Sequence, residues 1–142
     1  MRLVKHLLES KSGGVHAIEP ERPVLDAIRM MADKYVGALL VMRGDALIGI
    51  VSERDYARKV ILKGRSSADT PVSAIMSAPV VSVGPGESAH RCMRLMTDQR
   101  IRHLPVVDGE KVIGVLSIGD LVKAVIDEQA EQLEQLQRYI VG

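Results

Sequence analysis

The sequence predicts an α/β (α+β) protein made of two copies of one β-α-β-β-α unit, with a helix at each end of the chain. Three observations predict it. The chain repeats itself without gaps at an offset of 65 residues, from Pro20 and Pro85 to Asp55 and Asp120. Each copy carries an apolar face at helical spacing, and each then carries two short apolar runs around a Gly-containing turn.

Each copy opens with a short strand followed by a helix. The strand candidates are residues 15–18 and 80–83. Helical spacing then predicts a helix within 21–34 and another after Ser88, a candidate N-cap. The apolar faces of these helices are Val24, Ala27, Ile28, Met31 and Ala32 in the first copy, and Ala89, Cys92, Met93 and Met96 in the second.

A hairpin and a second helix complete each copy. The apolar runs 38–42 and 47–51 flank a turn at Gly44, and 104–107 and 112–116 flank a turn at Gly109. The second helices are expected to begin near Glu53 and Ile118.

The boundaries follow from the repeat and from a Ser-, Pro- and Gly-rich stretch between the copies. Apolar residues at helical spacing near the C-terminus predict a last helix that packs on the body of the protein or on a second subunit. The expected segments are an N-terminal helix or linker at 1–14, the first copy at 15–63, a linker at 64–78, the second copy at 79–126 and a C-terminal helix at 127–142.

The composition excludes several classes of function. With 19 basic and 18 acidic residues, no large field draws the chain to nucleic acid, and three Tyr without Trp or Phe provide few stacking surfaces. The single Cys92 forms no intrachain disulfide and fits a reducing compartment. No signal peptide and no apolar run of about 18 residues is present, so we expect a soluble, cytoplasmic protein without a membrane partner.

The sequence offers no catalytic constellation. A thiol nucleophile at Cys92 beside His90 is the alternative, but Cys92 falls on the apolar face of a helix and is expected in the core. The four histidines lack metal-ligand spacing. We therefore expect neither an enzyme, nor a metal site, nor a catalytic cofactor.

Two Ser-x-x-Asp motifs lie where a strand ends and a helix begins. Ser52 and Asp55 form the first, and Ser117 and Asp120 the second. A carboxylate in this position can accept hydrogen bonds from both hydroxyls of a ribose, and the helix N-terminus favours phosphate. The alternative interpretation is that both motifs are simply helix caps.

The motifs GIVSERD (49–55), GVLSIGD (114–120) and IRHLPV (101–106), duplicated in this element order, resemble a pair of CBS domains over roughly residues 8–126. The resemblance implies a regulatory module that binds an adenine nucleotide and forms a homodimer. It also implies two copies related by a pseudo-two-fold axis, with ligand clefts that mix residues of both copies. The aspartates of the motifs would hold ribose, and the serines would lie near ribose or phosphate.

The expected first cleft joins the Asp55 motif to the strand start of the second copy. Its basic residues would neutralise phosphate, and the alternative is that they form a solvated helix end. Its apolar residues would flank the adenine, although such residues are more often core. The predicted residues are Ile50, Ser52, Arg54, Asp55, Met76, Val81, Arg100, Ile101, Arg102 and His103.

The expected second cleft joins the Asp120 motif to the strand start of the first copy, near Tyr35. It lacks the arginines, and Lys11 and His16 would supply its positive charge. The predicted residues are Lys11, Val15, His16, Val36, Gly37, Ala38, Val115, Ser117 and Asp120.

The function expected from these features is a sensor that binds AMP, or next NAD, with ADP and ATP as further possibilities, and that signals to an unidentified partner protein. The alternatives are an interaction module that dimerises without ligand and a sensor of S-adenosylmethionine.

Overall fold

The structure, a computed structural model, describes residues 2–11 and 14–141 and divides into two compact units. The first unit holds residues 15–81. The second unit holds the N-terminal segment together with residues 82–142. Each copy of the repeat thus has a unit of its own, and the N-terminal segment folds with the second copy.

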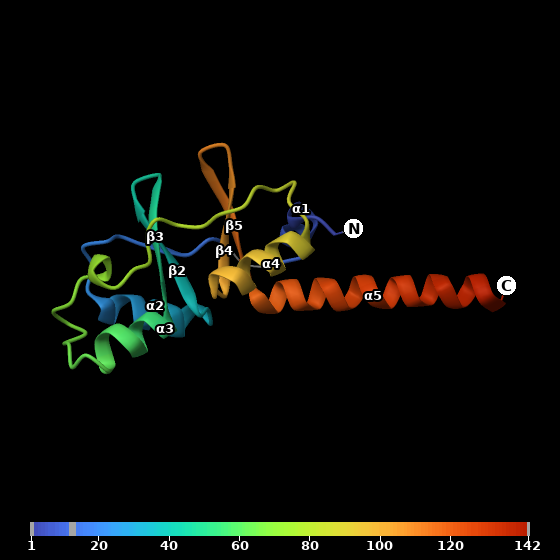
Figure 1. The fold of residues 1–142 in the computed structure, drawn as a ribbon. Helices are drawn as coiled ribbons and strands as arrows, with labels where there is room; N and C mark the ends of the chain where they lie inside the picture. The colour runs from blue at the N-terminus through green and yellow to red at the C-terminus, as the bar shows by residue number, and fades with distance from the viewer. Residues whose placement is uncertain (1, 12–13, 142) are drawn as a thin grey trace. The chain divides into compact units, whose positions relative to one another are not determined.

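The first unit is a three-stranded sheet in the order β1-β2-β3, with β1 parallel and β3 antiparallel to β2. Helices α2 and α3 contact each other and pack against β2 and β3 (Figure 1). Its elements are β1 (Ala17–Ile18), α2 (Val24–Lys34), β2 (Ala38–Arg43), β3 (Ala46–Ser52), α3 (Glu53–Tyr56), the π-helical η1 (Ala57–Ile61) and the 3-10 turn η2 (Val72–Ala74).

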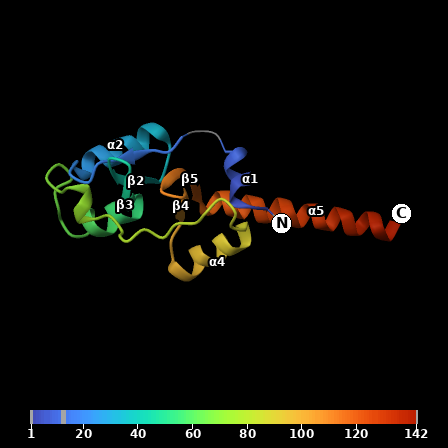
Figure 2. The same ribbon diagram turned by 90° about the horizontal axis from the view of Figure 1, so that it is seen from above.

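The second unit is an antiparallel β4–β5 hairpin with three helices. Helix α4 lies along the first half of α5, as both ribbon views show (Figures 1 and 2). Its elements are α1 (Val4–Glu9), α4 (Ala89–Gln99), β4 (His103–Asp108), β5 (Lys111–Ser117) and α5 (Ile118–Val141). Together the two units confirm the predicted α/β class.

The repeat extends to the irregularities of the backbone. Helices α2 and α4 both end in a left-handed residue, Tyr35 at φ 54° and Arg100 at φ 55°. Gly44 and Gly109 both adopt positive φ at the hairpin turns, where glycine is favoured. Each hairpin also shifts register once, after Val41 and after its counterpart 65 residues later. The internal repeat is therefore confirmed as a structural one.

The helical faces are buried much as their spacing predicts. The buried members are Val24, Ala27, Met31, Ala89, Cys92 and Met96, whereas Ala32 is exposed. The hydroxyl of Ser88 accepts a hydrogen bond from the Arg91 amide at 3.1 Å, as an N-cap does.

Three segments differ from the expected boundaries. The expected strand at 80–83 is a single parallel bridge between Val83 and Val106. The linker at 64–78 is part of the first unit, where Val72 and Ile75 are fully buried. The helix expected from residue 127 is the second half of α5, which runs without a break from Ile118.

The segments that precede each copy cover equivalent glycines. A Cβ on Gly49 of β3 would lie 2.5 Å from the Met76 sulfur, and a Cβ on Gly114 of β5 would lie 2.6 Å from Leu8 Cδ2. Residues 71–76 thus pack on the first copy and residues 3–8 on the second. Within the described part of the chain, no helix is long and apolar enough to cross a membrane.

Candidate functional site

Both Ser-x-x-Asp motifs form reciprocal caps at the start of a helix. The Ser52 amide donates to Asp55 Oδ2 at 2.9 Å, and the Asp55 amide donates to Ser52 Oγ at 3.3 Å. The Ser117 amide donates to Asp120 Oδ2 at 2.8 Å, and the Asp120 amide donates to Ser117 Oγ at 3.2 Å. The capping interpretation is therefore confirmed, and the caps fix both carboxylates in place.

Each motif abuts the strand start of its own copy. Ala38 pairs with Ser52 across β2 and β3, and His103 pairs with Ser117 across β4 and β5. The first helical amide also donates to a strand-start carbonyl, from Ile118 to Arg102 at 2.9 Å. The equivalent bond in the first unit, from residue 53 to residue 37, is 3.1 Å long.

The sequence prediction placed His103 and Arg102 beside Asp55, in a cleft that mixes the two copies. In the structure both residues lie beside the Asp120 motif of their own unit. The predicted pairing across the two copies remains a prediction. We name the residues Lys11, Arg102, His103, Ser117 and Asp120 of the second unit the Asp120 cluster, and the residues Gly37, Ala38, Ser52, Asp55 and Lys59 of the first unit the Asp55 cluster.

Each motif carboxylate also holds a lysine. Lys59, four residues after Asp55 on the same helical stretch, lies 3.1 Å from Asp55 Oδ1. Ala124 occupies the equivalent position in the second copy, and Lys11 from the N-terminal segment lies 2.9 Å from Asp120 Oδ2 instead. Lys11 Nζ also donates to the Val115 carbonyl at 2.7 Å.

The two motif carboxylates differ in whether an oxygen remains available to a ligand. Both oxygens of Asp55 have partners, and its side chain is 14% exposed. Asp120 is 29% exposed, and the contacts that the described residues make with it fall on Oδ2. Oδ1 of Asp120 is thus the carboxylate oxygen best placed to accept a hydrogen bond from a ligand.

Charge and burial act together on the second unit's titratable groups. Burial alone would raise the pKa of Asp120, but the Ser117 amide and the Lys11 ammonium hold that pKa below its ordinary value. Burial lowers the pKa of His103, and Lys11 and Arg102 lower it further against the opposing effect of Asp120. His103 is therefore a neutral hydrogen-bonding group near neutral pH, and the cationic charge of the cluster comes from Lys11 and Arg102.

The remaining predicted residues divide between core and surface. Val36 and Met76 pack against the core of the first unit, and Ile50, Arg54 and Val81 are half-buried. Val15 and Arg100 are exposed, whereas Ile101, Val115 and His16 are half-buried. His16 uses its backbone carbonyl to accept the Leu40 amide at 3.0 Å.

Cys92 is a core residue, as the sequence predicts. It is fully buried, and burial raises the pKa of its thiol to about 11. A protonated, inaccessible thiol is a poor nucleophile. Among the described residues, no three His, Cys, Asp or Glu side chains are grouped so that they could hold a metal ion.

A comparison of the sequence with models of known protein families identifies its family. The model of the CBS domain matches residues 10–62 and 72–127. The chain belongs to the CBS-domain family. It contains two CBS repeats, and CBS pairs are regulatory ligand-binding modules.

Curated relatives and solved structures agree with this assignment. The chain is 47% identical over 124 residues to the mitochondrial CBS domain-containing protein CBSX3 of Arabidopsis thaliana, covering 84% of this chain and 60% of that protein. It is 35% identical over 107 residues to the CBS domain-containing protein YhcV of Bacillus subtilis, covering 75% of this chain and 76% of that protein. A solved protein with CBS domains from Burkholderia ambifaria is 51% identical, with a TM-score of 0.87 over 90% of this chain and 96% of that one.

Proposed function

We propose that this CBS pair is a sensor of adenine nucleotides, with AMP as the favoured ligand and NAD next. In this proposal the Asp120 cluster holds the ribose and phosphate of the nucleotide. The observation that carries it is the capped and partly open carboxylate of Asp120 beside the Lys11 ammonium at the start of a long helix, with Arg102 at the adjoining strand start.

The proposed roles follow from the chemistry of each side chain. Asp120 Oδ1 accepts the ribose hydroxyls, and Lys11 and Arg102 neutralise the phosphate. The N-terminus of α5 adds a favourable dipole for an anion. His103 donates a hydrogen bond and takes up a proton when a phosphate dianion arrives.

The Asp55 cluster supports a weaker site. Its carboxylate is bonded on both oxygens, and α3 is a four-residue helix that continues into a π-helical turn. We therefore propose that the phosphate-bearing site lies in the second unit, which moves the phosphate site from the Asp55 motif to the Asp120 motif.

A second candidate ligand comes from a more distant structure. The CBS domain pair of protein MJ0100, 20% identical with a TM-score of 0.79, was solved in complex with 5′-methylthioadenosine and S-adenosyl-L-methionine. The sulfonium of the latter is a cation without phosphate, so Lys11 and Arg102 disfavour it electrostatically. AMP remains the preferred ligand.

Ligand specificity is tested by calorimetric titration of the full chain with AMP, NAD, GMP and S-adenosylmethionine, each with and without EDTA. We expect AMP to bind most tightly and EDTA to change nothing. Equal affinity for GMP, or loss of AMP binding on chelation, would contradict the proposal.

The proposal further includes a homodimer that passes the ligand signal to a partner protein in the cytoplasm, without catalysis. Neither cluster combines a nucleophile with a positioned general base, which is the support for a sensor over an enzyme.

A further inference from the structure

The second half of α5 carries an apolar stripe that the rest of its unit leaves exposed. Ile126, Leu133 and Ile140 recur every seven residues, with exposures of 58%, 57% and 73%. Val122, four residues before Ile126, and Leu136, between Leu133 and Ile140, belong to the same stripe and are 38% and 55% exposed. A repeat of alternating three- and four-residue steps is the pattern of a coiled-coil seam. We call these five residues and Gln129, the remaining position of the pattern, the α5 seam.

The α5 seam faces away from the body of the second unit. Leu121, Ala124 and Glu128 are the buried residues of this helix, and α4 packs along the same stretch. At about 100° per residue, the centre of the α5 seam lies roughly 125° around the helix from these three residues. The helix therefore has one covered face and a separate, uncovered apolar face.

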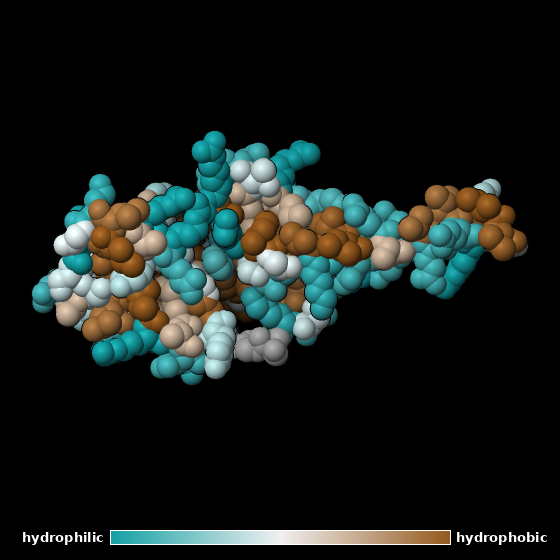
Figure 3. Space-filling view, turned by 90° about the horizontal axis from the view of Figure 1, so that it is seen from below, coloured by the Kyte–Doolittle hydropathy of each residue, from teal (hydrophilic) through white to brown (hydrophobic). Residues whose placement is uncertain are grey.

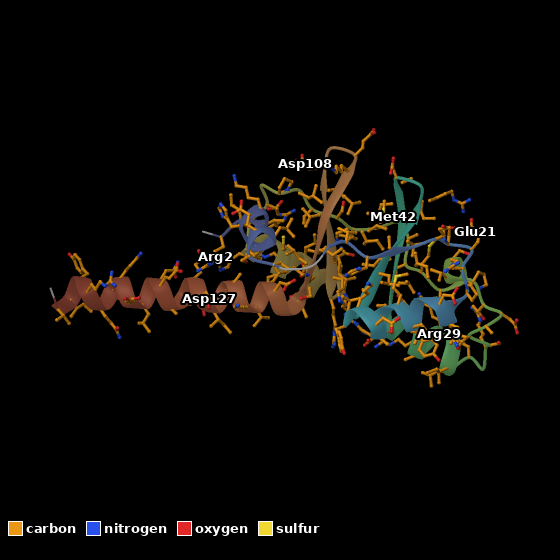
Figure 4. All side chains as sticks on the ribbon, turned by 180° about the vertical axis from the view of Figure 1, so that it is seen from behind. Arg2, Glu21, Arg29, Met42, Asp108 and Asp127 are labelled. Atoms are coloured by element: carbon orange, nitrogen blue, oxygen red, sulfur yellow. The ribbon has the colours of Figure 1, made fainter. Side chains whose placement is uncertain are left out.

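The distal part of α5 extends beyond the other elements of its unit (Figures 1 and 2). Apolar surface follows it to its C-terminal end (Figure 3), and its side chains past Asp127 project into open space (Figure 4). An exposed apolar stripe of this length is typical of an interaction surface.

We propose that the α5 seam pairs with the α5 seam of a second copy of this chain as a parallel, in-register two-stranded coiled coil. Beyond Lys123 near the start of the helix, the residues that would flank the contact carry no charge. A parallel pair places Val125 opposite Ala130 of the other copy and Gln132 opposite Gln137, so the flanks are apolar or hydrogen-bonding. The ion pair of Glu134 and Arg138 lies outside the seam, where it supports the helix itself.

Gln129 favours a parallel over an antiparallel pair of α5 helices. In a parallel pair its amide lies beside the same amide of the second copy, and each can satisfy the other. The antiparallel arrangement that matches the apolar positions would bury Gln129 against Leu133, leaving a polar group without a partner. The partner is thus a second copy in parallel register, and this inference is independent of the nucleotide site.

Oxidative cross-linking of the full chain at low micromolar concentration tests the proposal. Gln129→Cys places the new thiols within disulfide distance across a parallel seam, whereas Gln135→Cys, six residues further along and outside the seam, keeps them apart. The native thiol of Cys92 is fully buried and should not cross-link, and the unmutated protein measures any cross-link that it forms. We expect a covalent dimer from Gln129→Cys and at least tenfold less from Gln135→Cys.

A charge in the seam completes the test. Gln129→Cys combined with Leu133→Glu should lose the cross-link at least tenfold, and Gln129→Cys combined with Gln135→Glu, an equal charge outside the seam, should keep it. No cross-link from Gln129→Cys would overturn the parallel pair and leave another partner or an antiparallel pair for the surface. A cross-link that survives Leu133→Glu would show that the apolar stripe does not hold the copies together.

Discussion

Asp120 and Asp55 are equivalent in sequence but not in surroundings. Each caps a helix and each contacts a lysine, yet Asp55 is bonded on both oxygens and is the more buried. Sequence comparison alone treats the two as interchangeable ribose ligands. The oxygen that each lysine contacts distinguishes them, because Lys59 contacts Oδ1 of Asp55 whereas Lys11 contacts Oδ2 of Asp120.

Replacing each aspartate in turn measures this difference. Asp120→Asn should weaken AMP and adenosine alike, about tenfold or more, since a hydrogen bond to a charged group contributes about 1.5–3 kcal/mol. Asp55→Asn, the matched change in the first copy, should alter both affinities less than threefold. Calorimetric titration gives the affinities, and a larger loss from Asp55→Asn would assign the ribose to the other cluster.

His103 predicts a pH dependence of stability. Its pKa in the folded protein lies below the ordinary value of 6.5, so the unfolded chain takes up a proton first as the pH falls. The free energy of unfolding should therefore decrease from about pH 6.5 down to the lowered pKa, with no contribution from His103 above that range. Urea unfolding at pH 7.5 and pH 5.5 measures the decrease.

In His103→Asn, the free energy of unfolding should fall less between pH 7.5 and pH 5.5 than in the unmutated protein. The same substitution at His16, a histidine of the first unit, should have a smaller effect. The same loss in both variants would remove His103 as its source. Titration of the imidazole by NMR adds a direct readout, because bound AMP should raise the pKa of His103.

The motifs could be predicted from the sequence because their contacts are local. A hydroxyl and a carboxylate three residues apart at a helix start cap each other wherever they occur, and Asp55 and Lys59 are likewise one helical turn apart. The sequence analysis placed Lys11 and Asp120 in the same cleft, but the two lie 109 positions apart, so no local pattern reveals their direct contact. The placement of Arg102 and His103 beside Asp120 likewise depends on the pairing of β4 with β5.

At the scale of elements, the segments that precede each copy form a second repeat that the 65-residue offset conceals. At an offset of 68 residues, Val4 and Val72 are both fully buried, and Leu7 and Ile75 are both buried. The next pair is Leu8, which packs on Gly114, and Met76, which packs on Gly49. The different spacing separates this pattern from the main repeat. It could have been found by comparing these apolar triplets directly.

Gly114→Ala tests the contact between α1 and β5. The added methyl group would lie 2.6 Å from Leu8 Cδ2, so overpacking should destabilise the protein by roughly 1–3 kcal/mol. Gly86→Ala adds the same methyl group where nothing lies within 4 Å and is the control. Denaturant unfolding gives the free energies.

In the Leu8→Ala background, Gly114→Ala should cost markedly less, because the clashing atoms are gone. An equal cost in both backgrounds would show that the two residues do not interact.

At the scale of the whole molecule, a sensor should bind its ligand and release it unchanged. Prolonged incubation with ATP or NAD, followed by chromatography, should recover the input in full. Bound AMP should also raise the melting temperature in a concentration-dependent way, since a ligand of the folded state stabilises it by mass action. Turnover above a buffer blank would contradict the sensor.

The central claim is that the Asp120 cluster holds the phosphate of an adenine nucleotide, and one affinity ratio tests it most directly. AMP and adenosine are titrated into the unmutated protein, into Arg102→Ala and into Arg94→Ala, an exposed arginine of α4 that serves as the control. Arg102→Ala should weaken AMP about tenfold or more at about 1.4 kcal/mol per decade, and should leave adenosine unchanged because adenosine has no phosphate. Arg94→Ala should change neither affinity. If the ratio of AMP to adenosine affinity stays the same in Arg102→Ala, the phosphate does not lie at the Asp120 cluster and the proposed site is wrong.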